Sequence, residues 1–425
     1  MQLPSILEAP LPAHAPTLGI SAVIRRLEEA DLPISRLEPA PPDDPELEWA
    51  LDLTYADEDT ELQLQVYKTH TDRELVSSHV ELGSLPEDQA QALLACSSSL
   101  GLRTMLDPVH PLRAFHIQLR ILALIAPEAA GLVDQSAFTA HPMGWLEEAA
   151  SSPVPPHPHS LWTIHAVWED EGTWLHTHGL HRCGVIELDM VDIPRDQAAN
   201  MAQLLNTAAT LMLDHGVPES DEPFEVGQDM PLVWLDVDTA LDKLGRVRHG
   251  GPDERDPLHH PHRGVLAVKE KGLLWGHNHR SPTRYAEQME GHPLLYVSDL
   301  ETARRTALAI HRFDRMLALW RAHQESPALR FLVKLGIPTR AHGREHIWFD
   351  LHGLGERGLD LSCLNQPHDV PWLREGDRGW HDTELLSDWM ILCPLGQIGP
   401  DAIARIEALV ADPAVLRELE TMFED

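Results

Sequence analysis

The chain has 425 residues, of which 67 are acidic and 33 are Lys or Arg, giving a formal net charge of −34. A field of this sign repels nucleic acid and anionic membrane surfaces, and it favours a basic protein as a partner. No run of about 18 apolar residues occurs, so we expect no helix that spans a membrane. The N-terminus has neither a basic region nor a long apolar segment, which predicts no signal peptide and a cytoplasmic location.

Apolar periodicity predicts the elements of the N-terminal region. Residues 20–27 are expected to form a short amphipathic helix, and residues 49–69 alternate on both sides of an acidic turn, as in a β-hairpin. Ser84 and Glu87 have the spacing of a capping box and predict the start of a second helix. Residues 111–124 carry one apolar stripe, which predicts a third helix.

A proline-rich connector, residues 151–160, leads to the middle region. Residues 161–170 and 173–193 both alternate with a period of two, and the acidic turn between them predicts a second hairpin. Pro194 is expected to begin a helix that continues to about Asp214. This region therefore combines a sheet with a covering helix.

The C-terminal region opens with Ser298 and Glu301, a second capping box, followed by one long helix with an apolar face that reaches Trp320. Short strands separated by Gly and Pro follow, and Pro400 begins a closing helix. We therefore predict an α+β protein with antiparallel sheets, flanking helices and a small β-rich C-terminal domain. The predicted domains are an N-terminal α+β region at 1–150, a histidine-rich β/α region at 151–296, and the β-rich domain at 297–425.

The segment TWLHTHGLHRCGVIELD, residues 173–189, places three histidines and a cysteine close together. Side chains alternate along a strand, so His176 and His178 share one face, and neutral imidazoles are ligands for zinc. His181 and Cys183 would complete a tetrahedral site if the strand bends at Gly179, which separates these two residues from His176 and His178. The segment is therefore a candidate zinc site.

A structural interpretation competes with this zinc site. The rings of a solvent-facing strand hydrogen-bond to water, to backbone and to acidic neighbours such as Glu187, whereas zinc ligands need supporting partners that the sequence does not show. The spacing H-x-H-x-x-H resembles that of the metallo-β-lactamase-like hydrolases, but Leu180 stands where that family has an aspartate ligand. We therefore predict no cofactor, and a zinc-dependent hydrolase that uses Glu187 as its acidic group is the alternative.

Two other groups of residues are weaker candidates. Glu345 and Asp388 could approach one another and form a carboxylate pair for general acid–base catalysis, or they could instead hold turns and backbone. Neither a P-loop, a nucleophile elbow nor a dinucleotide-binding fingerprint occurs. A second histidine group lies on a loop with prolines, which is a poor preorganised metal site. Its members are His249, His259, His260 and His262.

Two parts of the chain resemble families of uncharacterised bacterial proteins. The residues Val133-Asp134-Gln135-Ser136, Trp145-Leu146, Trp174 to Leu180, Arg182-Cys183-Gly184 and Glu187-Leu188 are similar to those of the family numbered 4026, from the N-terminus to about Pro261. The residues Ala303-Arg304-Arg305-Thr306, Glu345-His346-Ile347-Trp348, Leu364-Asn365-Gln366-Pro367, Gly376-Asp377 and Ser387-Asp388-Trp389-Met390 resemble the domain of unknown function numbered 2314. Both resemblances imply an architecture and a bacterial origin, but no activity. They also imply that residues 1–296 form one 4026-like unit.

The acidic charge and the missing catalytic motifs together favour a binding or interaction protein over an enzyme. We predict a basic toxin-like or effector-like protein as its partner, and neither nucleic acid nor membrane. Trp174, Trp348 and Trp389 lie on predicted strands and are candidate anchors for that partner if they are exposed. The sequence indicates no oligomeric state.

Overall fold

The computed structural model describes residues 2–15, 18–83, 85–168, 172–245, 247–251, 254–255, 260–271, 277–290, 295–340 and 343–424. The chain divides into two compact units, residues 1–298 and 299–425. Ser84 of the first predicted capping box and His259 of the second histidine group lie outside the described residues. Within the described part of the chain, no helix is both long and apolar enough to cross a bilayer.

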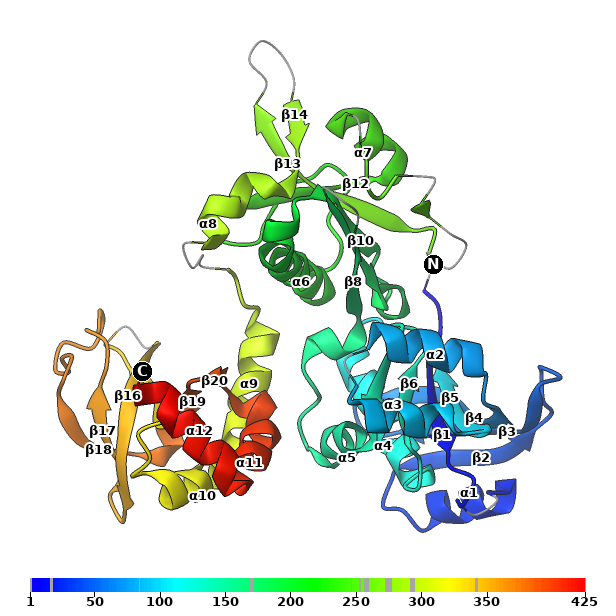
Figure 1. Cartoon of the computed structure of the whole chain (residues 1–425), viewed down its shortest axis with the longest axis horizontal. Helices are drawn as coiled ribbons and strands as arrows, with labels where there is room; N and C mark the ends of the chain where they lie inside the picture. Colours follow the sequence, from blue (N-terminus) through cyan, green and yellow to red (C-terminus); the bar gives the residue numbers. More distant parts are fainter. Residues whose placement is uncertain are drawn as a thin grey trace. The chain divides into compact units, whose positions relative to one another are not determined.

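The first sheet of unit 1 is antiparallel and has the strand order β2-β3-β4-β5-β1-β6-β7. Its strands are β1 (Ser5–Leu11), β2 (Ile34–Ala40), β3 (Leu47–Ala56), β4 (Glu61–His70), β5 (Ser98–Thr104), β6 (Gly131–Asp134) and β7 (Thr139–Pro142). The helices around it are α1 (Ile20–Glu28), α2 (Arg73–Leu82), α3 (Glu87–Leu94), α4 (Pro111–Ile125) and α5 (Met143–Ser151) (Figure 1). The predicted helices at 20–27 and 111–124 and the hairpin at 49–69 are confirmed.

Side-chain alternation gives this sheet two differently covered faces. Leu132 of β6 packs into the large core with α4, whereas its neighbour Val133 packs with Val76 of α2 and Leu93 of α3 on the other face. Glu8 of β1 is buried on the strand next to β6, and the Tyr67 hydroxyl donates to its Oε1 at 3.2 Å. Burial raises the pKa of Glu8 to about 7.

We expect Glu8→Gln to remove a pH dependence of stability. Between pH 4.5 and 7 the unfolded chain has lost the Glu8 proton while the folded protein keeps it, so stability falls as pH rises. One pKa unit corresponds to about 1.4 kcal/mol, so the total loss should be about 3–4 kcal/mol, of which about 2–3 kcal/mol falls between pH 5 and pH 8. Urea unfolding at pH 5 and pH 8 measures this change in the free energy of unfolding. Glu61 is exposed, so the control Glu61→Gln should keep the pH dependence of the wild type. If the stability of Glu8→Gln depended on pH as strongly as that of the wild type, the expectation would be contradicted.

The second sheet of unit 1 is mixed and has the strand order β11-β12-β13-β10-β9-β8, with β14 paired to β13. Its strands are β8 (Thr163–Trp168), β9 (Thr173–His178), β10 (Glu187–Ile193), β11 (Phe224–Glu225), β12 (Pro231–Asp236), β13 (Arg263–Lys271) and β14 (His277–Arg280). The parallel pair β10–β13 departs from the prediction of antiparallel sheets. The chain between these two strands is long and contains α6 (Ala198–His215), β11, β12 and α7 (Val237–Leu244), and a long connection with helices permits parallel pairing.

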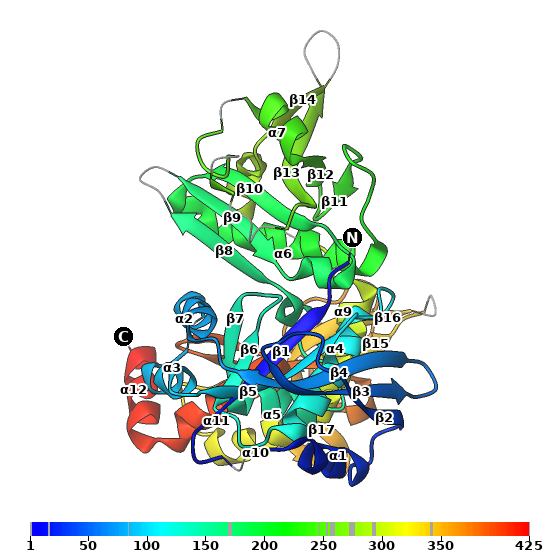
Figure 2. The same ribbon diagram turned by 90° about the vertical axis from the view of Figure 1, so that its right-hand side faces the viewer.

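The two faces of this sheet are covered by different elements. Leu175, Leu188 and Leu266 face α6, which runs beside β8, β9 and β10 in Figure 2. On the opposite face, Trp174 and Val265 pack with Ala240 of α7 (Val237–Leu244). The short helices of this part are η1 (Pro158–Leu161), η2 (Leu180–Cys183), η3 (Arg195–Gln197), η5 (Pro282–Tyr285) and α8 (Ala286–Glu290).

Unit 2 is a sheet with helices on one face and the strand order β18-β17-β16-β15-β19-β20. The single long helix predicted up to Trp320 is wrong, because the helix breaks at Arg312 and Ile310 is 57% exposed. The elements are α9 (Asp299–His311), α10 (Phe313–His323), β15 (Arg330–Pro338), β16 (Arg344–Gly355), β17 (Gly358–Cys363), β18 (Arg378–His381), η6 (Thr383–Leu385), β19 (Leu386–Cys393), β20 (Gly396–Ile398), η7 (Pro400–Ala402), α11 (Ile403–Ala411) and α12 (Pro413–Glu424). The α+β class is confirmed.

Candidate metal centre

Three histidines converge on one face of the β8–β9 hairpin. His165 pairs directly with His176 across the two antiparallel strands, and His178 lies two residues further along β9. Because strand side chains alternate, all three imidazoles project from the same face. One ring nitrogen from each lies within 4.8 Å of the other two. Ligands of a tetrahedral zinc ion are about 3.3 Å apart, so small ring rotations would close this set around an ion.

The burial of the cluster leaves one side accessible. His176 and His178 are 2% and 5% exposed, whereas His165 is half-buried. The ring centroids of His165 and His178 are 4.6 Å apart, and those of His176 and His178 are 4.9 Å apart. The rings of His176 and His178 therefore form the buried side of the cluster, and the ring of His165 lies on its solvent side.

His181 and Cys183, the other two residues of the predicted zinc site, leave this face. The strand ends at Gly179, whose φ of +118° is left-handed and where a Cβ would meet the Leu161 carbonyl oxygen at 2.3 Å. The chain then enters η2, and Cys183 becomes part of the hydrophobic core. Burial raises the pKa of the Cys183 thiol to about 12, which disfavours the thiolate that binds metals.

The carboxylate of Glu187 stabilises this turn by accepting four hydrogen bonds. Its Oε1 accepts from the Gly179 N–H at 2.9 Å, from the His181 N–H at 3.0 Å and from the His181 Nδ1 at 2.6 Å. Its Oε2 accepts from the Thr177 hydroxyl at 2.5 Å. Burial acts to raise the pKa of Glu187, but the bonds from His181 and Thr177 and the charge of Arg263 outweigh it and lower the pKa. The carboxylate therefore shapes the end of β9 and does not face the three histidines as a proton acceptor.

Two family models match the chain. Residues 7–156 match the model described as "Protein of unknown function (DUF4026) N-terminal", and residues 164–267 match its C-terminal counterpart. Together they cover more than half of the chain. The chain belongs to the DUF4026 family. The matched segments stop before unit 2, and the resemblance of that unit to the domain numbered 2314 is not supported. No curated protein and no solved structure matches the chain.

The histidine cluster lies where the two DUF4026 segments meet. All three histidines belong to the C-terminal segment, whereas Phe138, from the loop between β6 and β7, belongs to the N-terminal segment. The Phe138 ring contacts His178 at a centroid distance of 4.6 Å, and the ring of His79 stacks on Phe138 at 5.3 Å. Phe138 has a φ of +51°, a strained value for a bulky residue that the surrounding contacts must hold.

A hydrogen bond donated to Thr163 orients the ring of His165. The Thr163 hydroxyl donates its single proton to the Ala137 carbonyl oxygen, so its oxygen accepts from the Nε2 of His165 at 3.3 Å. This arrangement places the ring proton on Nε2 and the lone pair on Nδ1. Ligating histidines in proteins commonly have their second nitrogen oriented by such a partner.

A buried ion network lies beside the cluster. Asp189 of β10 pairs with His176 in the strand register, and its carboxylate accepts from Arg263 at 2.8 Å and from Arg255 at 2.6 Å. Burial acts to raise the pKa of Asp189, but the two guanidinium groups lower it, so the carboxylate is ionised. Because it is already held by two cations, Asp189 supports the cluster rather than adding a metal ligand.

In the part of the chain that the structure describes, the other predicted histidines and carboxylates form neither a metal-ligating group nor a carboxylate pair. Among the described residues, the converging metal-ligating group is the one on β8 and β9. His260 stacks on His181 with centroids 5.0 Å apart, and the backbone N–H of His249 donates to Asp192. Glu345 accepts from two backbone N–H groups at 2.7 Å, and Asp388 pairs with an arginine of α9 at 2.9 Å. Strand β15 lies between Glu345 and Asp388, so the structure does not bring them together.

The three tryptophans predicted as anchors have different environments. Trp174 is 1% exposed and stacks on His176 with centroids 4.1 Å apart, so it forms a wall of the histidine cluster. Trp389 is fully buried and donates to the Ala309 carbonyl oxygen at 2.9 Å. Trp348 is half-buried beneath the ammonium group of Lys334. Trp174 and Trp389 are therefore inaccessible to a partner in this fold.

Proposed function

We propose that this DUF4026 protein binds one zinc ion through His165, His176 and His178. The observation that carries the proposal is the convergence of three imidazoles from two paired strands onto one point. Imidazole nitrogens suit zinc, and a set of three protein ligands with an open fourth position is typical of catalytic zinc sites, whereas structural sites have four protein ligands. The donor set differs from the predicted one, since His165 replaces His181 and Cys183.

The chemistry that fits such a centre is hydrolysis. Zinc in a three-histidine set supplies a Lewis acid and an activated water. The chain's own residues would position the ligands: Thr163 orients His165, while the rings of Trp174 and Phe138 restrict rotation of His176 and His178. The half-buried His165 marks the side from which a substrate would approach.

Metal analysis of protein purified without a histidine tag tests the proposal. We expect one zinc per chain in the wild type and less than a tenth of that in His165→Ala and in His176→Ala. Loss of a metal ligand should lower the affinity for zinc by more than the about 10–100-fold that follows loss of a residue supporting a ligand. His70, exposed at the end of β4, provides the matched control His70→Ala.

Two further variants separate the observed donor set from the predicted one. His181→Ala and Cys183→Ala should both retain zinc, because these side chains turn away from the cluster. Retention of zinc in His165→Ala together with its loss in Cys183→Ala would contradict the proposal and restore the set predicted from the sequence. Absence of stoichiometric zinc, after incubation with the ion and removal of the excess, would exclude the site.

A second proposal is that the protein binds a basic protein partner in the bacterial cytoplasm. The formal charge of −34 supports it, as do Trp168, Trp372 and Trp380, which are 52%, 58% and 45% exposed. All four cysteines are free, as expected in a reducing compartment. Pull-down from the native host at low and high salt tests this: a partner should be retained at low salt and released at high salt.

A further inference from the structure

Strand β8 forms a free edge of the second sheet, next to the histidine cluster. It pairs with β9 over all six of its residues without a bulge, and no other strand among the described residues pairs with it. In Figure 2, β8 lies at the margin of this sheet. His165, which lies on the solvent side of the cluster, belongs to β8. The accessible side of the cluster therefore lies at a strand edge that is open to pairing.

The other end strands of the three sheets have features that disfavour pairing, and β8 has none of them. Strand β2 contains Arg36, Glu38 and Pro39 and has an irregular register. Strands β11 and β20 have two and three residues, while β7 and β18 have four and contain a proline and an arginine, respectively. The sequence of β8, TIHAVW, contains neither proline nor Asp, Glu, Lys or Arg. A strand edge without these features is a template for another strand.

The hydrogen bonds of the neighbouring strands show which backbone groups of β8 point outward. The Leu188 N–H of β10 donates to the Thr177 hydroxyl oxygen on β9 at 2.8 Å, so the backbone of Leu188 faces β9. Backbone N–H and C=O groups alternate in direction along an antiparallel strand. Followed through the pairs of β10 with β9 and of β9 with β8, this alternation places the backbone groups of Ile164 and Ala166 on the free side. None of the residues that the structure describes hydrogen-bonds to them there.

The end of β8 presents apolar side chains and a surface for a cation. Val167 and Trp168 are 37% and 52% exposed. The Arg195 guanidinium lies over the Trp168 ring, 5.4 Å from its centroid, so this ring already interacts with one cation. The net charge of −34 attracts basic segments to the chain from a distance. A basic segment is therefore the charge complement of the chain that carries this edge.

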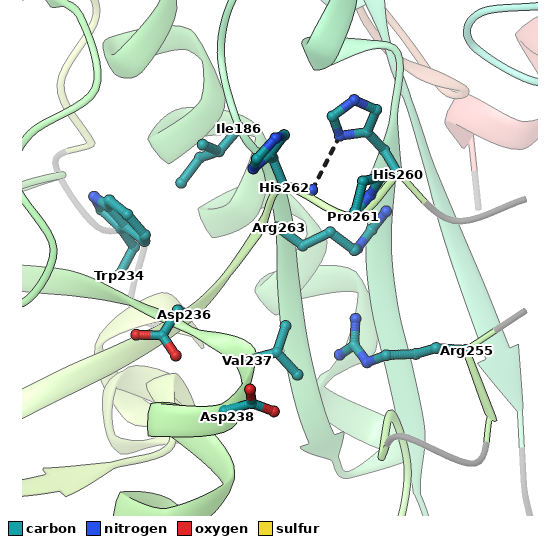
Figure 3. A pocket seen from close by; sticks show the side chains of 10 residues that line it. All are labelled: Ile186, Trp234, Asp236, Val237, Asp238, Arg255, His260, Pro261, His262 and Arg263. Atoms are coloured by element: carbon teal, nitrogen blue, oxygen red, sulfur yellow. Dashed lines mark hydrogen bonds between the residues drawn. The ribbon is translucent and has the colours of Figure 1, made fainter. Parts of the chain in front are cut away.

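A pocket of about 540 Å³ also opens on this sheet, beside α7 (Figure 3). Arg255 and Arg263 line it, and both pair with Asp189, at 2.6 and 2.8 Å. The carboxylate of Asp189 thereby already serves as their counterion, so the two guanidinium groups do not form an anion site. The free edge is the feature of this sheet that has unused hydrogen-bonding groups facing solvent.

We infer that an extended basic peptide segment binds to β8 as an additional strand. Its backbone pairs with the outward N–H and C=O groups of Ile164 and Ala166, as in other complexes formed by strand addition. Its apolar side chains lie beside Val167 and Trp168, and its basic side chains are attracted by the acidic chain. The inference rests on the proposed binding of a basic protein and names the surface that binds it. The pairing itself needs no zinc, although the bound segment borders His165.

Fluorescence anisotropy of the full chain with a rhodamine-labelled peptide, Lys-Lys-Thr-Val-Thr-Val-Thr-Lys-Lys, tests the inference. Ala166→Pro removes an outward N–H but no hydrogen bond to β9, so an edge strand tolerates it. We expect this variant to bind the peptide about tenfold more weakly than the wild type, because proline cannot donate and its ring crowds the added strand. Ala166→Ser keeps the N–H and is the matched control, which should bind as the wild type does.

Two changes in the peptide separate pairing from charge. N-methylation of its central amides keeps the charge but removes the donors, whereas replacement of its lysines by glutamates keeps the backbone but reverses the charge. Each change should weaken binding by about tenfold. Equal binding of the parent and N-methylated peptides would show adsorption by charge alone and overturn the inference. Equal binding of the glutamate peptide, or no binding of the parent peptide at about millimolar concentration, would overturn it as well.

Failure of this inference is distinguishable from failure of the proposed functions. Ala166→Pro should keep the zinc content of the wild type, and equal binding of the peptide by this variant and the wild type would overturn the inference. A lower zinc content would indicate a damaged hairpin, and the comparison of the parent and N-methylated peptides then decides. A pull-down that recovers no partner would count against the proposed basic protein, but it would leave the binding of this synthetic peptide to β8 unchanged.

Discussion

Replacing Asp134 by alanine is expected to lower the free energy of unfolding of unit 1 by about 3–5 kcal/mol, because it leaves a buried guanidinium without its counterion. Arg182 and Asp134 are both fully buried, and their two hydrogen bonds are each 2.9 Å long. Arg182 also donates to the Leu161 carbonyl oxygen at 2.7 Å and lies over the ring of Phe115 at 4.6 Å. Its position is thus fixed from several sides, so it cannot move to solvent without unfolding.

Urea unfolding, with hydrogen exchange of the β1 and β6 amides to report on unit 1, measures this loss. The ion pair between the exposed Arg330 and the half-buried Asp350 supplies the control, since Arg330→Ala should cost less than about 1 kcal/mol. The double variant Asp134→Leu, Arg182→Met should be less destabilised than Asp134→Ala, because it removes both charges together. A loss below 1 kcal/mol in Asp134→Ala would show that the pair contributes little.

Zinc is expected to stabilise the wild type by about 4 kcal/mol when present at about 1,000 times its dissociation constant, because it binds the folded hairpin and not the unfolded chain. The double variant His176→Ala, His178→Ala should gain nothing from zinc, while His70→Ala should gain as much as the wild type. Thermal unfolding with zinc, and again after chelation, measures the difference. Equal stabilisation of the double variant would place the bound ion elsewhere on the chain.

The sequence predicts the shared face of His176 and His178, because alternation along a strand is a local property. It could also have indicated His165: residues 165 and 176 are equidistant from the acidic turn, so the register of the predicted hairpin sets them opposite each other. A bend at Gly179 predicts that His181 and Cys183 return toward the strand as two further ligands. The bend occurs, but the hydrogen bonds to Glu187 direct the chain into a short helix instead.

Features that depend on distant parts of the chain could not be predicted. Phe138 reaches His178 from another sheet, and no local pattern links the two residues. Trp174 and Trp389 are buried because other elements pack against their strands. Alternation along a strand predicts which side chains share a face, but not which face is covered. Similarly, the pocket beside α7 combines residues from two strands, a helix and a loop that are separate in sequence.

The ion pair between Arg182 and Asp134 joins the two DUF4026 segments, since each segment contributes one charge. A gene that encoded only one of the two segments would produce a fragment in which Arg182 or Asp134 lacks its oppositely charged partner. Cloning boundaries placed near residue 160 should therefore yield insoluble pieces, and fission of the gene at that point would be selected against. The two segments are expected to be inherited together as one evolutionary unit.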